Sequence, residues 1–368
     1  MILIATQCFP PRCGGMENLM GGLAMALADR GRRLLVYADG HGEQAELERD
    51  RTLPYPIERN RGFKPLRRLH KALRIRRRLA AGDIAGLFTD SWKSAEWIAD
   101  AALTRQVPLV CLAHGNELLD GGSARRRLRI LKTLSRTHRV AANSEDTAAR
   151  VRALGVEAHH VKVVHPGISP LATVSGDELN DLALGSPVLL TLARLEPRKG
   201  QDRVIAAAAK LVREFPSLSY VIAGDGPDRV RLQTLCHDAG LTERVTFTGR
   251  VSETRKAALL ARADLFIMPN RFEASTRSVE GFGIVYIEAA LAGVPSIAGR
   301  SGGAQDAVLD GVTGLLCDGD DPNSIADTLR RCLRDRDLLI SLGRAAQRRA
   351  RANFLWPSAL DAYLDCLE

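Results

Sequence analysis

Short apolar runs alternate with stretches of helical periodicity along the chain, and this alternation restricts the fold more than any other feature. Such a βαβ rhythm is typical of open parallel sheets, so it predicts the α/β class. Ligands of such sheets bind beyond the carboxyl ends of the strands. The expected strands are Ile2–Ala5, Leu34–Tyr37, Leu87–Phe88, Leu109–Leu112, Val140–Ala142, Val161–Val164, Val188–Leu192, a strand ending at Ala223, Val245–Arg250, Leu265–Met268 and Ser296–Ala298.

A break in the rhythm divides the chain. Between Pro166 and Pro187 the periodicity is lost and Gly, Pro and Ser become frequent, which is typical of a linker. The 368 residues suffice for two domains that each bury a core. We therefore expect an N-terminal domain at 1–167, a linker at 168–187, a second domain at 188–345 and a C-terminal helix at 346–368.

The composition, 45% hydrophobic and 26% charged, is that of a soluble globular protein. No apolar run reaches the length of a membrane span, and the first residues lack the basic segment of a signal peptide. The seven cysteines include no C-x-x-C pair, which argues against a zinc site or a disulfide framework. A reducing cytoplasm and no bound metal or cofactor are expected.

The positive charge is concentrated in the first half. Residues up to His165 carry a net charge of +11, and the remainder carries −2. No acid lies between Glu58 and Asp83, where Leu66, Leu69, Leu73 and Leu79 form an apolar stripe. The basic residues in or beside that run are Arg59, Arg61, Lys64, Arg67, Arg68, Lys71, Arg74, Arg76, Arg77 and Arg78, and a second cluster spans Arg125–Lys132.

Three readings of these clusters compete. A solvated basic face is the commonest reason for such a pattern. Two clusters in one domain favour an anionic membrane surface, to which each basic residue adds about 1 kcal/mol. Nucleic acid is disfavoured because single-strand binders use aromatic stacking platforms, whereas only Phe63 interrupts the first run. We therefore expect an anionic membrane partner and no nucleic acid.

The segment from Met268 to Pro295 combines glycines and acidic residues at one strand-to-helix junction. Gly281 and Gly283 precede a helix that should begin near Ile284, and a glycine-rich helix N-terminus suits a phosphate. Glu280 and Glu288 are eight positions apart, or about 12 Å if both are helical. Two carboxylates at that spacing could bracket a nucleotide-sugar, although solvated surface acids are the simpler interpretation of the pair alone.

Cations follow the first strand of the second half. Arg194, Arg198 and Lys199 precede a helix, where positive charge suits a pyrophosphate, although they could also be ordinary surface cations. The loop at Gly224 lacks the last glycine of G-x-G-x-x-G, because Arg229 stands there, so no dinucleotide fingerprint is present.

The first half offers two candidate loops at strand ends. Gly14 and Gly15 stand before an expected helix at Leu19–Ala28, where a simple glycine turn is an equal alternative. His114 directly follows a strand, and strand-end loops are where such folds keep functional groups. A lone histidine is nevertheless more often structural.

The segment Met268–Pro295 resembles the signature of the retaining glycosyltransferases of family 4. Its longer loop after Met268-Pro269 is similar to that of the phosphatidylinositol mannosyltransferase branch. The resemblance implies the GT-B fold, with two Rossmann-like domains, the donor in a central cleft and a C-terminal helix that crosses back to the N-terminal domain. Two departures are Ala193 for a glycine and Gln305-Asp306 for Pro-Glu.

The resemblance also implies roles for single residues. Arg194 and Lys199 would bind the donor diphosphate, His114 and Glu280 the hexose, and Glu288 the ribose hydroxyls. His114, Glu280, Arg194 and Lys199 would form the catalytic set, and no general base is assigned because the leaving phosphate would accept the proton. Further donor contacts are expected from Gly15, Gly281, Phe282, Gly283 and Ile284, and acceptor contacts from Glu17, Asn116 and Glu117.

The sequence therefore predicts a retaining, metal-independent glycosyltransferase. It would move a mannose- or glucose-type hexose from a GDP- or UDP-sugar to a lipid-linked or polyisoprenoid-linked acceptor, at the inner face of the cell membrane. A GT-B hydrolase or phosphorylase and a non-catalytic nucleotide-binding module are the alternatives. An oxidoreductase would need the missing dinucleotide fingerprint.

Overall fold

The computed structural model describes residues 1–12, 14–119, 121–174 and 176–368. They form two compact units, of which the first joins Met1–Ser169 with Leu355–Glu368 and the second is Pro170–Phe354. The units differ from the expected boundaries in two places. Most of the expected linker belongs to the second unit, and the expected start of the last helix at 346 falls inside a helix of that unit.

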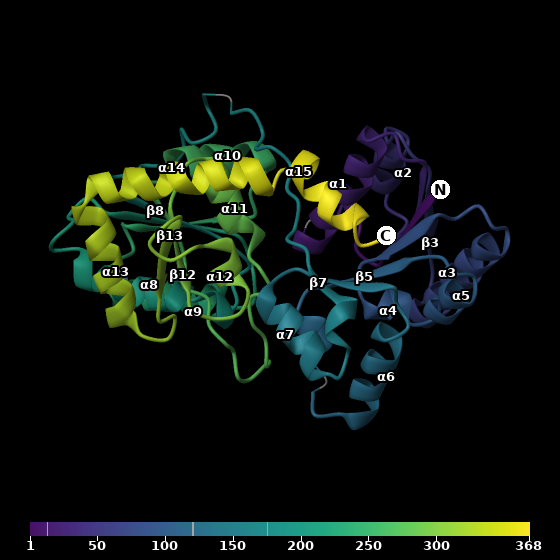
Figure 1. The fold of residues 1–368 in the computed structure, drawn as a ribbon. Coiled ribbons are helices and arrows are strands. Elements are labelled where there is room, and N and C mark those ends of the chain that lie inside the picture. Colours follow the sequence, from purple (N-terminus) through teal and green to yellow (C-terminus); the bar gives the residue numbers. More distant parts are fainter. Residues whose placement is uncertain (13, 120, 175) are drawn as a thin grey trace. The chain divides into compact units, whose positions relative to one another are not determined.

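The first unit is built on a seven-stranded parallel sheet in the order β3-β2-β1-β4-β5-β6-β7 (Figure 1). The chain adds β2 and β3 on one side of β1 and then returns to place β4 on the other side, with Ile2 opposite both Leu34 and Gly86. The strands are β1 (Ile2–Ala5), β2 (Leu34–Asp39), β3 (Ile57–Asn60), β4 (Gly86–Thr89), β5 (Leu109–Ala113), β6 (Arg139–Ala142) and β7 (Val161–Val163).

Helices cover both faces of this sheet. Neighbouring side chains of β1 point to opposite faces, and each is packed in a core. Leu3 belongs to the core with Ile75 and Leu79, whereas Ile4 belongs to the core with Leu23 on the other face. The helical elements are α1 (Gly15–Asp29), α2 (Gln44–Asp50), α3 (Lys64–Ala80), α4 (Trp92–Ala95), α5 (Ala99–Thr104), η1 (Asn116–Leu118), α6 (Ala124–Leu134), α7 (Glu145–Ala153) and η2 (Ala158–His160).

The last helix, α15 (Trp356–Leu364), packs against α1, as the resemblance implied (Figure 1). Trp356 is the main contact, because a side-chain carbon added to Gly22 would lie 2.2 Å from its indole nitrogen, and one added to Gly167 would lie 2.6 Å from its ring. Two glycines therefore make room for one buried indole, and this fixes the C-terminal segment on the first unit.

The second unit holds a six-stranded parallel sheet in the order β10-β9-β8-β11-β12-β13, with the same reversal between β8 and β11. Its core joins the strands to α8 (Gln201–Leu211) and α13 (Pro322–Arg334) through residues such as Leu189, Ile267, Val204 and Leu329. The strands are β8 (Val188–Leu192), β9 (Ser219–Ala223), β10 (Val245–Gly249), β11 (Leu265–Met268), β12 (Ser296–Gly299) and β13 (Gly314–Cys317).

The helical elements of the second unit are η3 (Pro197–Lys199), α8 (Gln201–Leu211), α9 (Arg229–Asp238), α10 (Glu253–Arg262), α11 (Ile284–Leu291), α12 (Ala304–Ala307), α13 (Pro322–Arg334) and α14 (Arg336–Asn353). Within the described ranges, no helix is both long and apolar enough to cross a membrane.

We predict that Gly22→Ala destabilises the first unit by about 1–3 kcal/mol, because the added methyl overpacks Trp356. In a helix without this contact, the same change is stabilising by roughly 0.5–1 kcal/mol. All three tryptophans lie in the first unit, so urea unfolding followed by tryptophan fluorescence measures it. Gly176→Ala, which meets nothing within 4 Å, is the control, and a stabilised Gly22→Ala variant would contradict the packing.

Candidate functional site

The strand order of the second unit reverses between β8 and β11, and the loops that leave these two strands contain most of the expected donor residues. Ligands of open α/β sheets bind at such a switch point. The loops touch each other, since the Arg271 backbone N–H donates to the Arg198 carbonyl at 3.0 Å. Gly200 has φ 78°, and a side chain there would lie 2.3 Å from the Pro269 carbonyl oxygen, so the approach requires glycine.

Glu280 joins the cations of the first loop to the second loop. Its carboxylate pairs with the Lys199 ammonium and accepts from the Arg198 guanidinium at 3.0 Å. Burial raises the pKa of Glu280, but the charges of Lys199 and Arg198 outweigh burial and hold that pKa below the usual value of a glutamate. Glu280 is therefore an anion that neutralises two largely buried cations.

Arg194 differs from these cations because its side chain is 73% exposed. It pairs with Glu196 at 3.1 Å, and Glu196 also pairs with Arg198 at 3.0 Å. The structure thus brings Arg194, Lys199 and Glu280 into one connected charge network. Arg194 is the member with the freedom to reach a ligand.

The glycine-rich loop before α11 is fixed by its backbone. Gly283 has φ 88° and is the N-cap of α11, and the Gly303 backbone N–H donates to the Glu280 carbonyl at 2.9 Å. Gly281 is buried, and Ile284 begins the helix. The Phe282 side chain is also buried, with its ring 5.8 Å from that of Phe354, so only its backbone is left for the expected donor contact.

Glu288 lies in α11 and pairs with Lys256 of α10 at 2.5 Å. Burial lowers the pKa of Lys256, but Glu288 and then Glu253 outweigh burial, and the pKa is raised. Glu280 lies before the helix and the chain turns at Gly283, so the two glutamates do not share one helix axis. The expected separation of about 12 Å assumed that both glutamates are helical, and this assumption is wrong.

Sequence reasoning missed Asn270, which is fully buried under the same loops. Its side-chain oxygen accepts from the Gly299 backbone at 3.2 Å and its nitrogen donates to the Ser301 carbonyl at 2.7 Å. The Tyr286 hydroxyl lies 2.7 Å from that oxygen and 2.5 Å from the Met268 carbonyl. Asn270 thus holds the ends of β11 and β12 together, and its position two residues after a predicted strand was the available signal.

The first unit reverses its strand order between β1 and β4, and Asp90 stands at the end of β4. Its side chain is fully buried and accepts from the Thr6 hydroxyl at 2.9 Å, the Gln7 backbone at 2.6 Å and the Ser94 hydroxyl at 2.6 Å. Asp90 thereby fixes the segment that leaves β1. It was missed in the sequence, although it lies two residues after the expected strand Leu87–Phe88.

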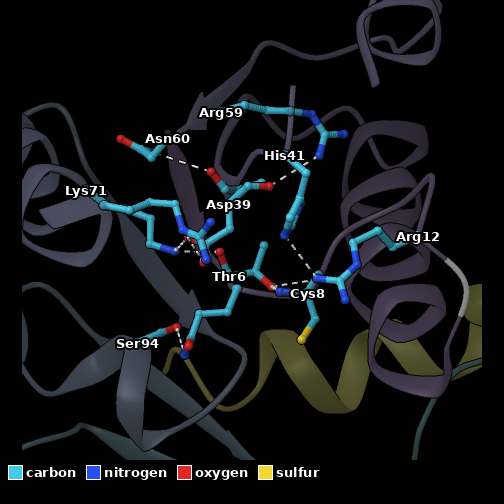
Figure 2. A network of polar contacts seen from close by, with 12 residues as sticks. Thr6, Cys8, Arg12, Asp39, His41, Arg59, Asn60, Lys71 and Ser94 are labelled. Carbon is cyan, nitrogen blue, oxygen red and sulfur yellow. Dashed lines mark hydrogen bonds and ion pairs between the residues drawn. The ribbon is translucent and has the colours of Figure 1, made fainter. Parts of the chain in front are cut away.

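A second acid, Asp39, ends β2 beside this segment (Figure 2). The buried Lys71 of α3 donates to Asp39 at 2.7 Å and to the Thr6 carbonyl at 2.6 Å. Arg67 of the same helix pairs with Asp39 at 2.9 Å. The carboxyl ends of β1, β2 and β4 are therefore crosslinked by charge-assisted hydrogen bonds.

His114 follows β5, and its ring is bound to the backbone of Asp90. Its Nε2 lies 3.0 Å from the Asp90 carbonyl, which can only accept, so Nε2 carries the proton. The His114 backbone N–H donates to the Glu117 carboxylate at 2.7 Å. The Glu117 carbonyl accepts from the Trp92 indole at 2.9 Å, and Asn116 begins η1. Glu117 thus has a structural task in addition to any acceptor contact.

Gly15 is exposed at the start of α1, and Glu17 lies in the first turn. A side-chain carbon added to Gly14 would lie 2.3 Å from the Glu17 carboxylate, which therefore folds over the helix N-terminus. Cys13 of the expected loop lies outside the described residues. Nowhere in the described ranges do three His, Cys, Asp or Glu residues gather in a way that could hold a metal ion.

Two family models match the chain. The model of Glycosyl transferases group 1 matches residues 178–349, and the model of Glycosyltransferase Family 4 matches residues 13–170. A GDP-mannose-dependent alpha-(1-6)-phosphatidylinositol monomannoside mannosyltransferase of Mycobacterium tuberculosis is 32% identical over 100% of this chain and 97% of its own. The protein of the same description from Mycolicibacterium smegmatis is 31% identical over 96% of this chain and 95% of its own.

Solved structures resemble the whole chain as well. Anabaena Alr3699/HepE in complex with UDP has a TM-score of 0.82 at 24% identity and covers 100% of this chain and 99% of its own. Sucrose-phosphate synthase from Thermosynechococcus elongatus has a TM-score of 0.77 at 22% identity, with 99% and 97% covered. These structures support the fold.

We predict that Glu280→Gln destabilises the second unit by roughly 3 kcal/mol, because it leaves Lys199 and Arg198 without their anion. The folded pKa of Glu280 is lowered, so its contribution is fully present above the unfolded pKa of about 4.3 and is lost as the pH falls through the folded pKa. The difference between wild type and variant should therefore shrink in acid.

Scanning calorimetry from neutral to acidic pH measures this difference. Glu253→Gln is the control, because Glu253 also pairs with a lysine but is 70% exposed, so its loss should cost less than about 1 kcal/mol. A stability difference for Glu280→Gln that does not change with pH would contradict the assignment.

Proposed function

From the premise that the chain belongs to glycosyltransferase family 4 and has the GT-B fold, we propose that it transfers mannose from GDP-mannose to a phosphatidylinositol-type lipid. The chain is a glycosyltransferase, and this donor and acceptor are those in the names of the mycobacterial relatives. The observation that supports donor binding best is the charge network of Arg194, Arg198, Lys199 and Glu280 at the β8/β11 switch point.

The proposed donor site works by exchange of anions. Without a ligand, Glu280 neutralises Lys199 and Arg198. A diphosphate carries more charge and more acceptor oxygens than one carboxylate, so it displaces Glu280 from Lys199, while the exposed Arg194 closes on it. The released carboxylate is then available to accept from hydroxyls of the hexose.

The remaining donor and acceptor assignments follow the family motifs. Glu288 accepts from the ribose hydroxyls, and His114 contacts the transferred sugar. The backbones of Gly15, Gly281, Phe282, Gly283 and Ile284 contribute to donor binding, and Glu17, Asn116 and Glu117 lie on the acceptor side.

Transfer is proposed to retain the anomeric configuration and to need no metal. Arg194 and Lys199 supply the positive charge that a departing diphosphate requires. The leaving phosphate accepts the acceptor proton, so no side chain acts as general base. A hydrolase or phosphorylase of the same fold is the remaining alternative, and it would release mannose or mannose phosphate without a lipid acceptor.

We predict that Arg194→Ala and Lys199→Ala each weaken GDP binding by about 1.5–3 kcal/mol, because each removes a hydrogen bond to a charged group. Calorimetry with GDP and UDP measures the affinities and compares the two donor bases. Arg213→Ala removes an exposed cation elsewhere in the second unit and is the control. Unchanged GDP affinity in both site variants would contradict the diphosphate site.

The reaction is tested with GDP-mannose and phosphatidylinositol monomannoside, with and without a chelator. Proton NMR of the first product should show the α configuration of the donor. An inverted product, dependence on added metal, or release of free mannose in place of transfer would each contradict the corresponding part of the proposal.

The structure revises the basic run that suggested membrane binding. Acids from other parts of the chain neutralise several of its members: Arg59 pairs with Asp50 and Glu46, Arg67 and Lys71 with Asp39, Arg68 with Glu96, Arg74 with Glu58, and Arg78 with Asp83. Among the described residues, Arg61, Lys64, Arg76 and Arg77 have no ion pair. Leu79, expected on the apolar stripe, belongs to the core.

An exposed apolar stripe nevertheless remains on α3. Leu66, Leu69 and Leu73 are 55%, 41% and 43% exposed and recur at helical spacing, and Phe63 before the helix is 74% exposed. On α6, Leu128 is 64% exposed between Arg125 and Lys132. Apolar side chains bordered by uncompensated cations are typical of a helix that lies in a membrane interface.

We therefore retain a peripheral site on the inner face of the cell membrane as part of the proposal. The outer face of α3 docks on anionic lipid, and α6 adds charge. The leucines contribute to membrane binding by burying apolar surface, and the cations contribute by attraction to anionic lipid. Salt screens only the attraction, with a screening length of about 8 Å at physiological ionic strength.

We predict that changing Lys64, Arg76, Arg125 and Lys132 to Gln weakens binding to vesicles that contain anionic lipid, mostly at low salt. Each basic residue near such a surface is worth about 1 kcal/mol. Sedimentation with vesicles of graded anionic content measures the effect. The control is a variant of the second unit that loses the same amount of charge, with Gln in place of Arg213, Arg344, Arg348 and Arg351. Equal losses of vesicle affinity in the two variants would contradict docking through the first unit.

A further inference from the structure

A pocket of about 410 Å³ lies between the carboxyl end of β3 and the helix α3 that follows it. β3 is the outermost strand of its sheet (Figure 1). The lining residues are Arg59, Asn60, Arg61, His70, Leu73, Arg74 and Arg77. Four arginines and a histidine around one cavity are unusual, because like charges repel unless an anion joins them.

The arginines of this pocket are not equivalent. Arg59 is built into the fold, since its guanidinium bonds to Asp50 at 2.7 Å and its side chain is only 5% exposed. Arg74 pairs with the partly exposed Glu58 at 2.8 Å. Arg61 and Arg77 are exposed and have no ion pair within the described part of the chain. Two positive charges at the mouth are therefore uncompensated.

The pocket borders the leucine stripe of α3. His70, Leu73 and Arg77 follow one another at helical spacing, so they form a row along one side of the helix. Leu73 belongs both to this row and to the exposed stripe. If the stripe enters the apolar part of a bilayer, the row lies at the level of the phosphates.

The pocket is separate from the expected catalytic residues of the first unit. β2, β1 and β4 lie between β3 and β5, and His114 directly follows β5. Four strand spacings correspond to roughly 19 Å. A ligand in the pocket therefore does not occupy the position of His114.

We propose that this pocket binds the phosphate of an anionic lipid headgroup, with Arg61 and Arg77 as the principal ligands and Arg74 as a third. An arginine fork matches phosphate oxygens in pairs, which a diffuse surface charge does not. The inference rests on the proposed membrane docking of α3, and it adds one defined site to an otherwise general attraction.

The test compares two double variants of the full chain with equal charge change. Arg61→Gln/Arg77→Gln alters the pocket, whereas Lys64→Gln/Arg76→Gln alters exposed cations of α3 that do not line it. Each is mixed with phosphatidylcholine vesicles containing phosphatidylglycerol. Glycerol 3-phosphate is added as a soluble competitor, against sodium chloride of the same ionic strength.

Glycerol 3-phosphate should displace the wild type and the Lys64/Arg76 variant beyond the effect of ionic strength, but not the Arg61/Arg77 variant. The Arg61/Arg77 variant should also lose at least tenfold in vesicle affinity, as expected when one charge-assisted hydrogen bond is removed. Equal losses in both variants, with no displacement by the competitor, would overturn the pocket and leave docking intact.

Calorimetry with glycerol 3-phosphate alone separates the remaining outcomes. If the wild type does not bind vesicles at all, docking fails, and so does the assignment of a lipid ligand. Binding of free glycerol 3-phosphate that requires Arg61 and Arg77 would in that case identify a site for a soluble phosphate instead.

Discussion

The reversal of strand order in each sheet is the constraint on which the candidate residues of each unit depend. In each sheet the chain first adds strands on one side of its first strand, β1 or β8, and then on the other side. The loops that leave β1 and β4 therefore run in opposite directions, and so do the loops that leave β8 and β11. Backbone groups there have no ladder partner beyond the strand ends, and side chains must satisfy them. Asp90 and Asn270 do this, because each bonds to backbone groups of these loops, whereas Glu280 pairs with side-chain cations there.

The acids Asp90 and Glu280 act differently because their hydrogen-bond partners differ. Asp90 accepts from hydroxyl and backbone donors, so its network is part of the fold and any ligand would have to replace several hydrogen bonds at once. Glu280 instead binds Lys199 and Arg198, and these cations can exchange one anion for another. If the proposed function holds, a diphosphate replaces Glu280 in the second unit, whereas the hydrogen bonds of Asp90 in the first unit stay in place.

The sequence predicted the strands that have apolar patterns and the residues placed at their ends. It missed β3, because β3 is a half-buried edge strand with the polar sequence Ile-Glu-Arg-Asn, and it also missed the short buried strand β13. It placed Arg194, Lys199 and Glu280 in one site, but not Lys256 as the partner of Glu288. Partners distant in sequence have no local pattern, and for the same reason the basic run looked more positive than the folded surface is.

Helix α3 shows how one periodic sequence meets three requirements at once. Its inner face contributes Ile75 and Leu79 to the core, and its outer face exposes the leucine stripe. Between them, Lys71 donates to the Thr6 carbonyl, Thr6 bonds to Asp90, and the Asp90 carbonyl accepts from His114. The helix proposed to dock on lipid is thus connected to the candidate catalytic histidine by buried hydrogen bonds. Lys71 is therefore buried because it completes this network, whereas Arg76 and Arg77 of the same helix are exposed.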